Sequence, residues 1–249
     1  MMSRTFLFAS VICAGILGLA TSHAQSCDAI NLNQGWTPVQ SEEFWFTSQG
    51  SRLMPYSWFL ALEVPDLARQ TLLKDPSNME RYGYISVPPS AQKNPDGLPI
   101  GFVKDSAPGT VDAIGFTCAA CHTGSLNIQG RRVIVEGGPA LSDFWLFLSE
   151  TVAALRMAES DPGKLARFSS RVLNQGNRTQ TAVEDLRRQM NKALVDLETR
   201  VTQNMSTNPY GYGRVDAFGH IFTRVLGQVL NEPANADPPA RATTPHTAV

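Results

Sequence analysis

The chain has 249 residues, of which 43% are hydrophobic and 17% charged, and its formal net charge at pH 7 is −1. This length allows one or two domains with a sizeable buried core. The nearly neutral charge argues against a nucleic-acid-binding protein, which would carry a basic surplus.

The first 24 residues have the anatomy of a secretory signal peptide. Arg4 supplies a positive charge, an apolar run follows over residues 6–20, and the sequence SHA at residues 22–24 is a small-x-small cleavage site. The apolar run is at the short end for a bilayer span. We therefore expect cleavage after residue 24. The mature protein is expected to be periplasmic or secreted, with no stable membrane insertion.

The sequence between Cys27 and about residue 115 is rich in turns and aromatic residues. Residues 56–63 predict a short buried helix that stops before Pro65, and the proline-rich residues 86–102 predict a loop. Just before the first of two closely spaced cysteines, apolar residues recur at i, i+3 and i+7 (Val111, Ile114 and Cys118). This spacing predicts a short helix on or beside these cysteines.

The second half of the chain predicts one hairpin and three helices. Alternating apolar residues on either side of Gly130 predict a small β-hairpin. A helix is expected after it, with Ser142 as N-cap and the sequence Asp-Pro-Gly at residues 161–163 as terminator. A longer helix is predicted by an apolar stripe at helical spacing: Val183, Leu186, Met190, Leu194, Leu197 and Val201.

The last predicted helix covers residues 215–230, and the tail at residues 232–249 is rich in Pro, Ala and Thr, which predicts disorder. The sequence shows no internal repeat. We therefore predict three segments: the signal peptide (1–24), a folded domain (25–231) and the tail (232–249). The fold class is predicted to be mainly α with one minor hairpin.

The stretch GFTCAACHTG places Cys118, Cys121 and His122 in a C-x-x-C-H spacing. A structural zinc site needs four ligands, usually as two pairs, and the mature chain offers only Cys27, His220 and His246 as further Cys or His ligands. A thioredoxin-type redox pair needs a βαβ context, which the sequence before the motif does not predict.

Attachment of haem c needs two thiols that bond to the two vinyl groups and an adjacent imidazole for the iron, which Cys118, Cys121 and His122 supply. This attachment takes place outside the cytoplasm, where the predicted export signal would place the chain. The odd number of cysteines left after cleavage of Cys13 argues against a disulfide framework, and Cys27 is expected to be a free thiol or to pair with another chain. We therefore predict one covalent haem c, with His122 as its proximal iron ligand.

The ligand on the other face of the haem decides between an electron carrier and a site that reacts with peroxide or O2. Met157 and His220 are candidates, and Met205 is a further one. Met54 and Met79 are also candidates. Met190 is the remaining candidate, but it lies in the apolar stripe and is expected to pack in the core. The sixth ligand, or its absence, stays open here.

Five aromatic residues before the motif are expected mainly as core material, with a role in shaping a haem pocket or an electron path as the alternative. They are Trp45, Phe46, Tyr56, Trp58 and Phe59.

Five stretches carry a resemblance to a known group: LMPYSWFLALE, NPDGLPIGFVKD, GFTCAACHTG, EGGPALSDFW and GYGRVDAFGHIFTRVL. Over about residues 35–235 the chain resembles the N-terminal half of exported di-haem c-type cytochromes related to bacterial cytochrome c peroxidases and rubber-oxygenase-like proteins. The resemblance implies a cytochrome c-like helical haem domain with a long N-terminal extension. It also implies that Cys118, Cys121 and His122 hold the reactive haem, which meets peroxide or dioxygen.

Two features depart from that group. No second C-x-x-C-H follows residue 122, so the chain is expected to be a truncated, split or frameshifted member that lacks the electron-transfer half. No histidine occurs between His122 and His220, so the switchable distal histidine of classical peroxidases has no counterpart.

These observations predict an exported c-type cytochrome that binds one covalent haem and transfers single electrons to or from a redox partner protein or a small donor or acceptor. The alternative is a haem enzyme of peroxidase or oxygenase type, or its N-terminal half, with an open distal face. A truncated product that binds haem without a function is the third possibility. The sequence assigns no catalytic residue.

Overall fold

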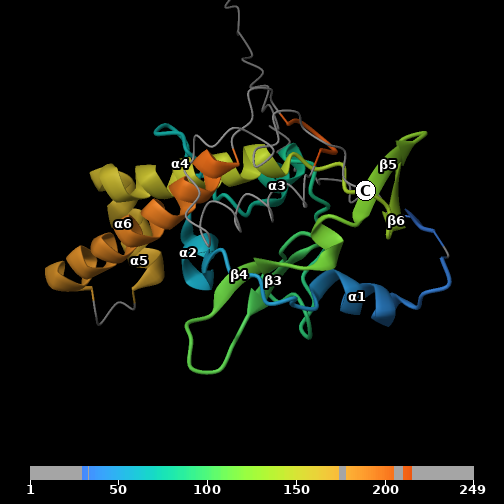
Figure 1. Cartoon of the computed structure of the whole chain (residues 1–249), viewed down its shortest axis with the longest axis horizontal. Coiled ribbons are helices and arrows are strands. Elements are labelled where there is room, and N and C mark those ends of the chain that lie inside the picture. Colours follow the sequence, from blue (N-terminus) through green and yellow to red (C-terminus); the bar gives the residue numbers. More distant parts are fainter. Residues whose placement is uncertain (1–29, 33, 174–177, 205–209, 215–249) are drawn as a thin grey trace, which may run out of the picture.

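The computed structural model describes residues 30–32, 34–173, 178–204 and 210–214. Of these residues 43% are helical and 16% lie in strands, so the described fold is mixed α/β (Figure 1). The prediction of a mainly α, cytochrome c-like helical domain is therefore wrong. The physical reason lies in the region before the motif, where short buried strands replace the expected loops.

One three-stranded sheet leads directly into the motif. It consists of β2 (Met54–Pro55), β3 (Phe102–Asp105) and β4 (Ala113–Phe116), and β4 lies in the centre and pairs antiparallel with both neighbours. The expected short helix on or beside the cysteines is confirmed only as a single 3-10 turn that begins at Cys118. The residues before it form a strand: Val111 is 72% exposed and precedes β4, whereas Ile114 and its two neighbours in β4 are buried, as in a strand covered on both faces.

A second sheet follows the motif and has the order β1-β6-β5. The predicted hairpin is confirmed as β5 (Thr123–Ile128) and β6 (Arg131–Glu136), and both residues of its turn have positive φ, 52° at Gln129 and 80° at Gly130. The strand β1 (Ile30–Asn31) pairs in parallel with the other side of β6.

Three short helices lie before the motif: α1 (Pro38–Phe46), α2 (Tyr56–Ala61) and α3 (Pro76–Arg81). The predicted buried helix at residue 56 is confirmed as α2. The sequence analysis did not predict α1, although its start carries a recognisable signal. Thr37 and Gln40 form a capping box with a proline at the first helical position.

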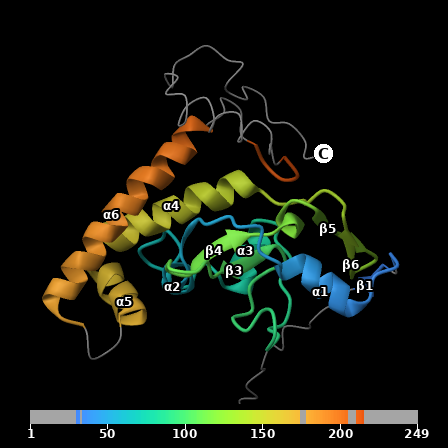
Figure 2. The same cartoon turned by 60° about the horizontal axis from the view of Figure 1, so that its bottom comes forward.

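Three longer helices gather at one end of the molecule, away from the hairpin (Figures 1 and 2). The predictions for α4 (Phe144–Ser160) and α6 (Gln180–Gln203) are confirmed, but Asp143 rather than Ser142 caps α4 by accepting a bond from the Leu146 amide at 2.9 Å. The sequence that ends α4 also begins α5 (Pro162–Val172), because Asp161 caps its first turn.

The buried apolar residues form two clusters of different size. The larger core joins α2, the α4–α6 helices and the sheet that contains β4; its fully buried members include Phe59, Phe102, Phe147 and Met190. The smaller core lies under the motif and consists of Ile85, Ile100, Ala119 and Ile134.

The predicted signal peptide, the helix at residues 215–230 and the tail at residues 232–249 lie outside the described residues. No helix in the described part of the chain is long and apolar enough to cross a bilayer.

Candidate functional site

The motif forms one tight turn at the end of β4. Cys118–Ala120 is a single turn of 3-10 helix, and the amides of Cys121 and His122 both donate to the carbonyl of Cys118, at 3.2 and 3.0 Å. The structure therefore brings the two cysteines and the histidine together within one turn, as their spacing predicts.

Thr117 anchors this turn to two other parts of the chain. Its hydroxyl donates to the carbonyl of Trp45 in α1 at 3.0 Å and accepts from the amide of Ala119 at 3.2 Å. Its backbone amide donates to the carbonyl of Gly101 at 2.8 Å. One residue thus fixes the start of the motif against both α1 and the loop before β3.

Gly101 allows this loop to approach the motif closely. Its φ is +92°, and a Cβ atom at this position would lie 2.4 Å from the backbone of Ala120. No side chain fits into that space, so the contact between the loop and the 3-10 turn requires glycine.

The other end of the motif is held by the chain that leaves β6. The amide of Gly137 donates to the carbonyl of His122 at 2.8 Å, and the amide of Ala140 donates to the carbonyl of Cys121 at 2.9 Å. These backbone bonds fix the position of His122, which immediately precedes β5.

The three motif side chains differ in their access to solvent. Cys118 and His122 are exposed, Cys121 is partly buried, and neither cysteine is in a disulfide. Burial, followed by the charge of Cys118, raises the pKa of the Cys121 thiol.

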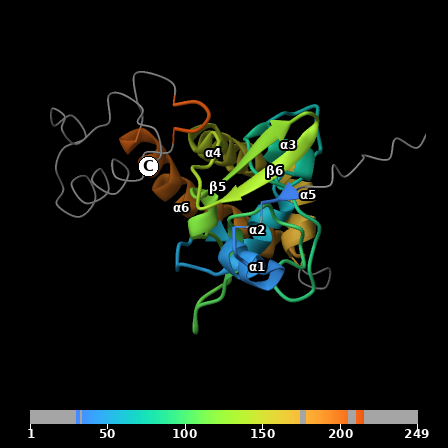
Figure 3. The ribbon, with the colours of Figure 1, turned by 90° about the vertical axis from the view of Figure 1, so that its right-hand side faces the viewer.

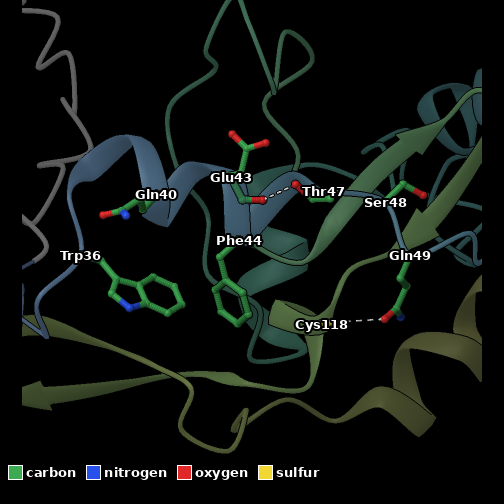
Figure 4. A pocket seen from close by; sticks show the side chains of 8 residues that line it. All are labelled: Trp36, Gln40, Glu43, Phe44, Thr47, Ser48, Gln49 and Cys118. Atoms are coloured by element: carbon green, nitrogen blue, oxygen red, sulfur yellow. Dashed lines mark hydrogen bonds between the residues drawn. The ribbon is translucent and has the colours of Figure 1, made fainter.

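A hollow of about 500 Å³ lies beside Cys118 and is shown in Figure 4. The rings of Trp36 and Phe44 line one side in an edge-to-face contact, with centroids 5.1 Å apart. On the other side the thiol of Cys118 donates to Oε1 of Gln49 at 3.4 Å. The other lining residues are Gln40, Glu43, Thr47 and Ser48, whereas Cys121 and His122 do not line the hollow.

The aromatic residues expected as core material occupy that role. Phe46, Tyr56, Trp58 and Phe59 are buried, and Trp45 packs against the smaller core. Trp36 and Gln49 were not predicted as site residues, and Phe44 was not among the aromatic residues expected near a haem. The capping box that starts α1 would have indicated which aromatic residues share a helix.

The described methionines give little choice of a second iron ligand. Met190 is fully buried in the larger core, which confirms the packing expected for it, and Met54 and Met79 are buried in the same core. Met157 is partly buried in the last turn of α4. Met205 and His220 lie outside the described residues.

A buried pair of polar side chains lies at the end of the hairpin next to the motif. Thr123, which follows His122, is directly opposite Glu136 in the hairpin, and their side chains are 4% and 6% exposed. Within the described structure the Thr123 hydroxyl and both carboxylate oxygens of Glu136 have no hydrogen-bond partner. Polar groups without a hydrogen-bond partner are unfavourable in a protein interior, so this pair lowers the stability of the fold.

The donor set fits a haem held covalently better than a metal ion held by side chains alone. Among the described residues, no three His, Cys, Asp or Glu side chains are grouped to hold one metal ion. Haem attachment requires only the two thiols and one imidazole. Neither thiol is in a disulfide, and Cys118 lies beside a hollow of a size usual for small-ligand sites.

No family model and no solved structure matches the chain. The chain is 32% identical over 233 residues to the uncharacterised protein y4iJ of Sinorhizobium fredii (strain NBRC 101917 / NGR234). The match takes in 82% of this chain and 37% of that relative, so the chain spans well under half of the relative's length.

Proposed function

We propose that the protein is an exported c-type cytochrome that carries one haem and transfers single electrons. The observation that carries this proposal is that Cys118, Cys121 and His122 lie together at a 3-10 turn, where the amides of Cys121 and His122 both donate to the carbonyl of Cys118, with both thiols outside any disulfide. Cys118 and Cys121 would hold the haem through thioether bonds, and His122 would be the proximal ligand of the iron. Residues 1–24 would direct the chain to the periplasm or out of the cell.

The bound haem would supply one-electron redox chemistry, and the chain's own residues would hold and shield it. The backbone bonds to Thr117, Gly137 and Ala140 fix the turn, which keeps the thiols and the imidazole in place. The rings of Trp36 and Phe44 offer apolar contact next to Cys118. A redox partner protein or a small donor or acceptor would complete the electron transfer.

Haem attachment can be tested by producing the full chain in a bacterium that matures c-type cytochromes. We expect haem staining to stay with the chain in a denaturing gel, and to disappear in the Cys118→Ser, Cys121→Ser double variant. Cys27→Ser is the matched control and should keep the stain. A wild-type chain without haem, or a Cys118–Cys121 disulfide that is reversibly reduced, would overturn the proposal.

Absorption spectra separate the carrier from the alternative, a haem enzyme that reacts with peroxide or O2. Because Met54, Met79 and Met190 are buried in the larger core, these spectra should test whether the haem face opposite His122 is open. A carrier should give a six-coordinate low-spin spectrum that carbon monoxide and cyanide leave unchanged. A high-spin spectrum that these ligands change would favour the enzyme. Under both, His122→Ala should abolish normal iron ligation.

A further inference from the structure

We infer that Gln49 is a positioning residue that orients the thiol of Cys118 toward the hollow and so promotes formation of the thioether bond at this cysteine. In that step the S–H bond would break and the thiol would add across a haem vinyl group, with the sulfur bonding to one vinyl carbon and the hydrogen to the other. The part that concerns the thiol rests on its contact with Gln49. The part that concerns the bond rests on the proposed function.

The direct contact is a hydrogen bond between side chains that are 69 residues apart in the sequence. The Cys118 thiol donates and Oε1 of Gln49 accepts, at 3.4 Å, a normal length for a bond that involves sulfur. Both side chains line the same hollow, in which Figure 4 shows them facing each other. An exposed thiol without such a partner would rotate among its rotamers, whereas this bond selects one.

The backbone around Gln49 is fixed on both sides, so its reach to Cys118 is built into the fold. Before it, the hydroxyl of Ser48 donates to Asp105 at 2.6 Å and accepts from the amide of Gly50 at 3.0 Å. After it, the hydroxyl of Ser51 donates to the carbonyl of Phe116 at 2.9 Å and accepts from the amide of the same residue at 2.7 Å.

A close backbone contact holds the same segment against the strand that leads into the motif. A Cβ atom on Gly115 would lie 2.0 Å from the carbonyl oxygen of Ser51, so no other residue fits there. The segment of Gln49 and the strand before Cys118 are therefore packed backbone to backbone. This arrangement places the side-chain amide of Gln49 next to the thiol of Cys118.

The two cysteines of the motif differ in this respect. Cys121 is partly buried, and its place is set by its surroundings, which include the buried Tyr84. Cys118 is exposed, and Gln49 supplies its side-chain partner. Loss of Gln49 should consequently affect the bond at Cys118 and spare the bond at Cys121.

The first arm of the test uses the chain made without haem, with Cys118 as its sole cysteine after serine substitution of the other three. Infrared spectroscopy measures the S–H stretching band, which moves to higher frequency when the thiol loses its acceptor. We expect this shift in Gln49→Ala and not in Gln49→Glu, which keeps an acceptor oxygen at the same reach. An identical band in the wild type and Gln49→Ala would overturn the inference.

The second arm uses the mature protein with all natural cysteines, denatured, alkylated and digested for mass spectrometry. We expect Gln49→Ala to raise the fraction of chains with an alkylated Cys118 several-fold, with Cys121 still bonded to haem, and Gln49→Glu to restore the wild-type fraction. Glu43→Gln is the matched control, since Glu43 lines the same hollow but pairs with Lys93 at 3.2 Å.

Equal attachment at Cys118 in the wild type and Gln49→Ala, or equal loss at both cysteines, would overturn the positioning role. If the wild-type chain carries no haem, the proposed function fails, and the infrared arm alone decides whether Gln49 orients the thiol.

Discussion

The helical end of the molecule and the region around the motif are held together in different ways. The helices α4, α5 and α6 pack through the larger core, in which Phe147, Leu155 and Met190 are almost completely buried. The motif lies on a core of only four buried residues, and its shape is set by side-chain bonds to the backbone and by close glycine contacts. The hairpin and α1 flank it at the other end of the molecule (Figure 3).

This difference teaches that stability and site geometry have separate origins in the molecule. Burial of apolar area supplies most of the free energy of folding, whereas single hydrogen bonds contribute about 1 kcal/mol each. A substitution in the larger core should therefore lower stability and leave the motif intact. A substitution at Thr117 or Gly101 should change the geometry of the motif itself.

The largest effect is expected from a buried ionic cluster at the helical end. Glu63 accepts bonds from Lys164, Arg167 and Arg171 at 3.3, 2.8 and 2.8 Å, and the Lys164 side chain is 2% exposed. Glu63→Gln leaves these cations without their anion and should cost about 3–5 kcal/mol in urea unfolding. Glu198→Gln, in the exposed pair with Arg156, is the control and should cost less than about 1 kcal/mol.

The same cluster gives a prediction for pH. Burial raises the pKa of Glu63, but the bonds from Arg167, Arg171 and Lys164 outweigh it and lower the pKa to about 2. A carboxylate with a lowered pKa stabilises the folded state fully above its unfolded pKa, near 4.5, and loses that contribution as the pH falls toward 2. The stability gap between the wild type and Glu63→Gln should narrow across this window; a constant gap would contradict the prediction.

Met190→Ala should lower the stability of the fold and leave the site unchanged. The side chain is fully buried in α6, so its removal should lower the free energy of unfolding by about 2–5 kcal/mol. We expect covalent haem and its spectrum to be unchanged, and a changed spectrum would make Met190 an iron ligand after all. Val195→Ala, at a 63% exposed position of the same helix, is the control and should have little effect.

Gly101→Ala should change the geometry of the motif itself. The new Cβ would collide with the backbone of Ala120, and the positive φ adds strain of about 1–3 kcal/mol. Gly109→Ala is matched in φ, at +73°, but meets no atom within 4 Å. Gly101→Ala should therefore lose more stability than Gly109→Ala, and only Gly101→Ala should reduce the yield of covalent haem. Equal haem yields would show that the close contact does not shape the motif.

Thr117→Val is expected to have the smallest effect on stability, about 1 kcal/mol, because it keeps the shape and removes the hydroxyl. Its consequence should be local: the amide of Ala119 loses its acceptor and should exchange its hydrogen faster. Thr110→Val removes a hydroxyl that bonds to Ala107 at 2.8 Å in an exposed turn and should leave the Ala119 amide unchanged. Unchanged exchange in both variants would contradict the anchoring role of Thr117.

The sequence allowed the periodic elements to be predicted. The apolar stripe through Met190 defines α6, and the alternation around Gly130 defines the hairpin, because each pattern repeats over enough residues to fix its period. The short strands were missed for the opposite reason. Met54 and Ile114 are paired in the sheet but lie far apart in the chain, and strands of two to four residues carry no period of their own.

The motif itself could be read from the sequence, since Cys118, Cys121 and His122 lie within five residues. The hollow beside it could not, because Gln49 and Trp36 reach it only through the packing of α1 and the bonds of Ser51 to β4. Local spacing predicts which atoms can react. The partners of those atoms depend on contacts between distant parts of the chain.

The parallel pairing of β1 with β6 has a consequence for the order of folding. The hairpin of β5 and β6 joins neighbouring residues through a two-residue turn and can form within microseconds. The bonds between Gln34 and Glu136 instead join residues 102 positions apart, and closing so long a loop costs more conformational entropy. We therefore expect the hairpin to form first and β1 to close the sheet last.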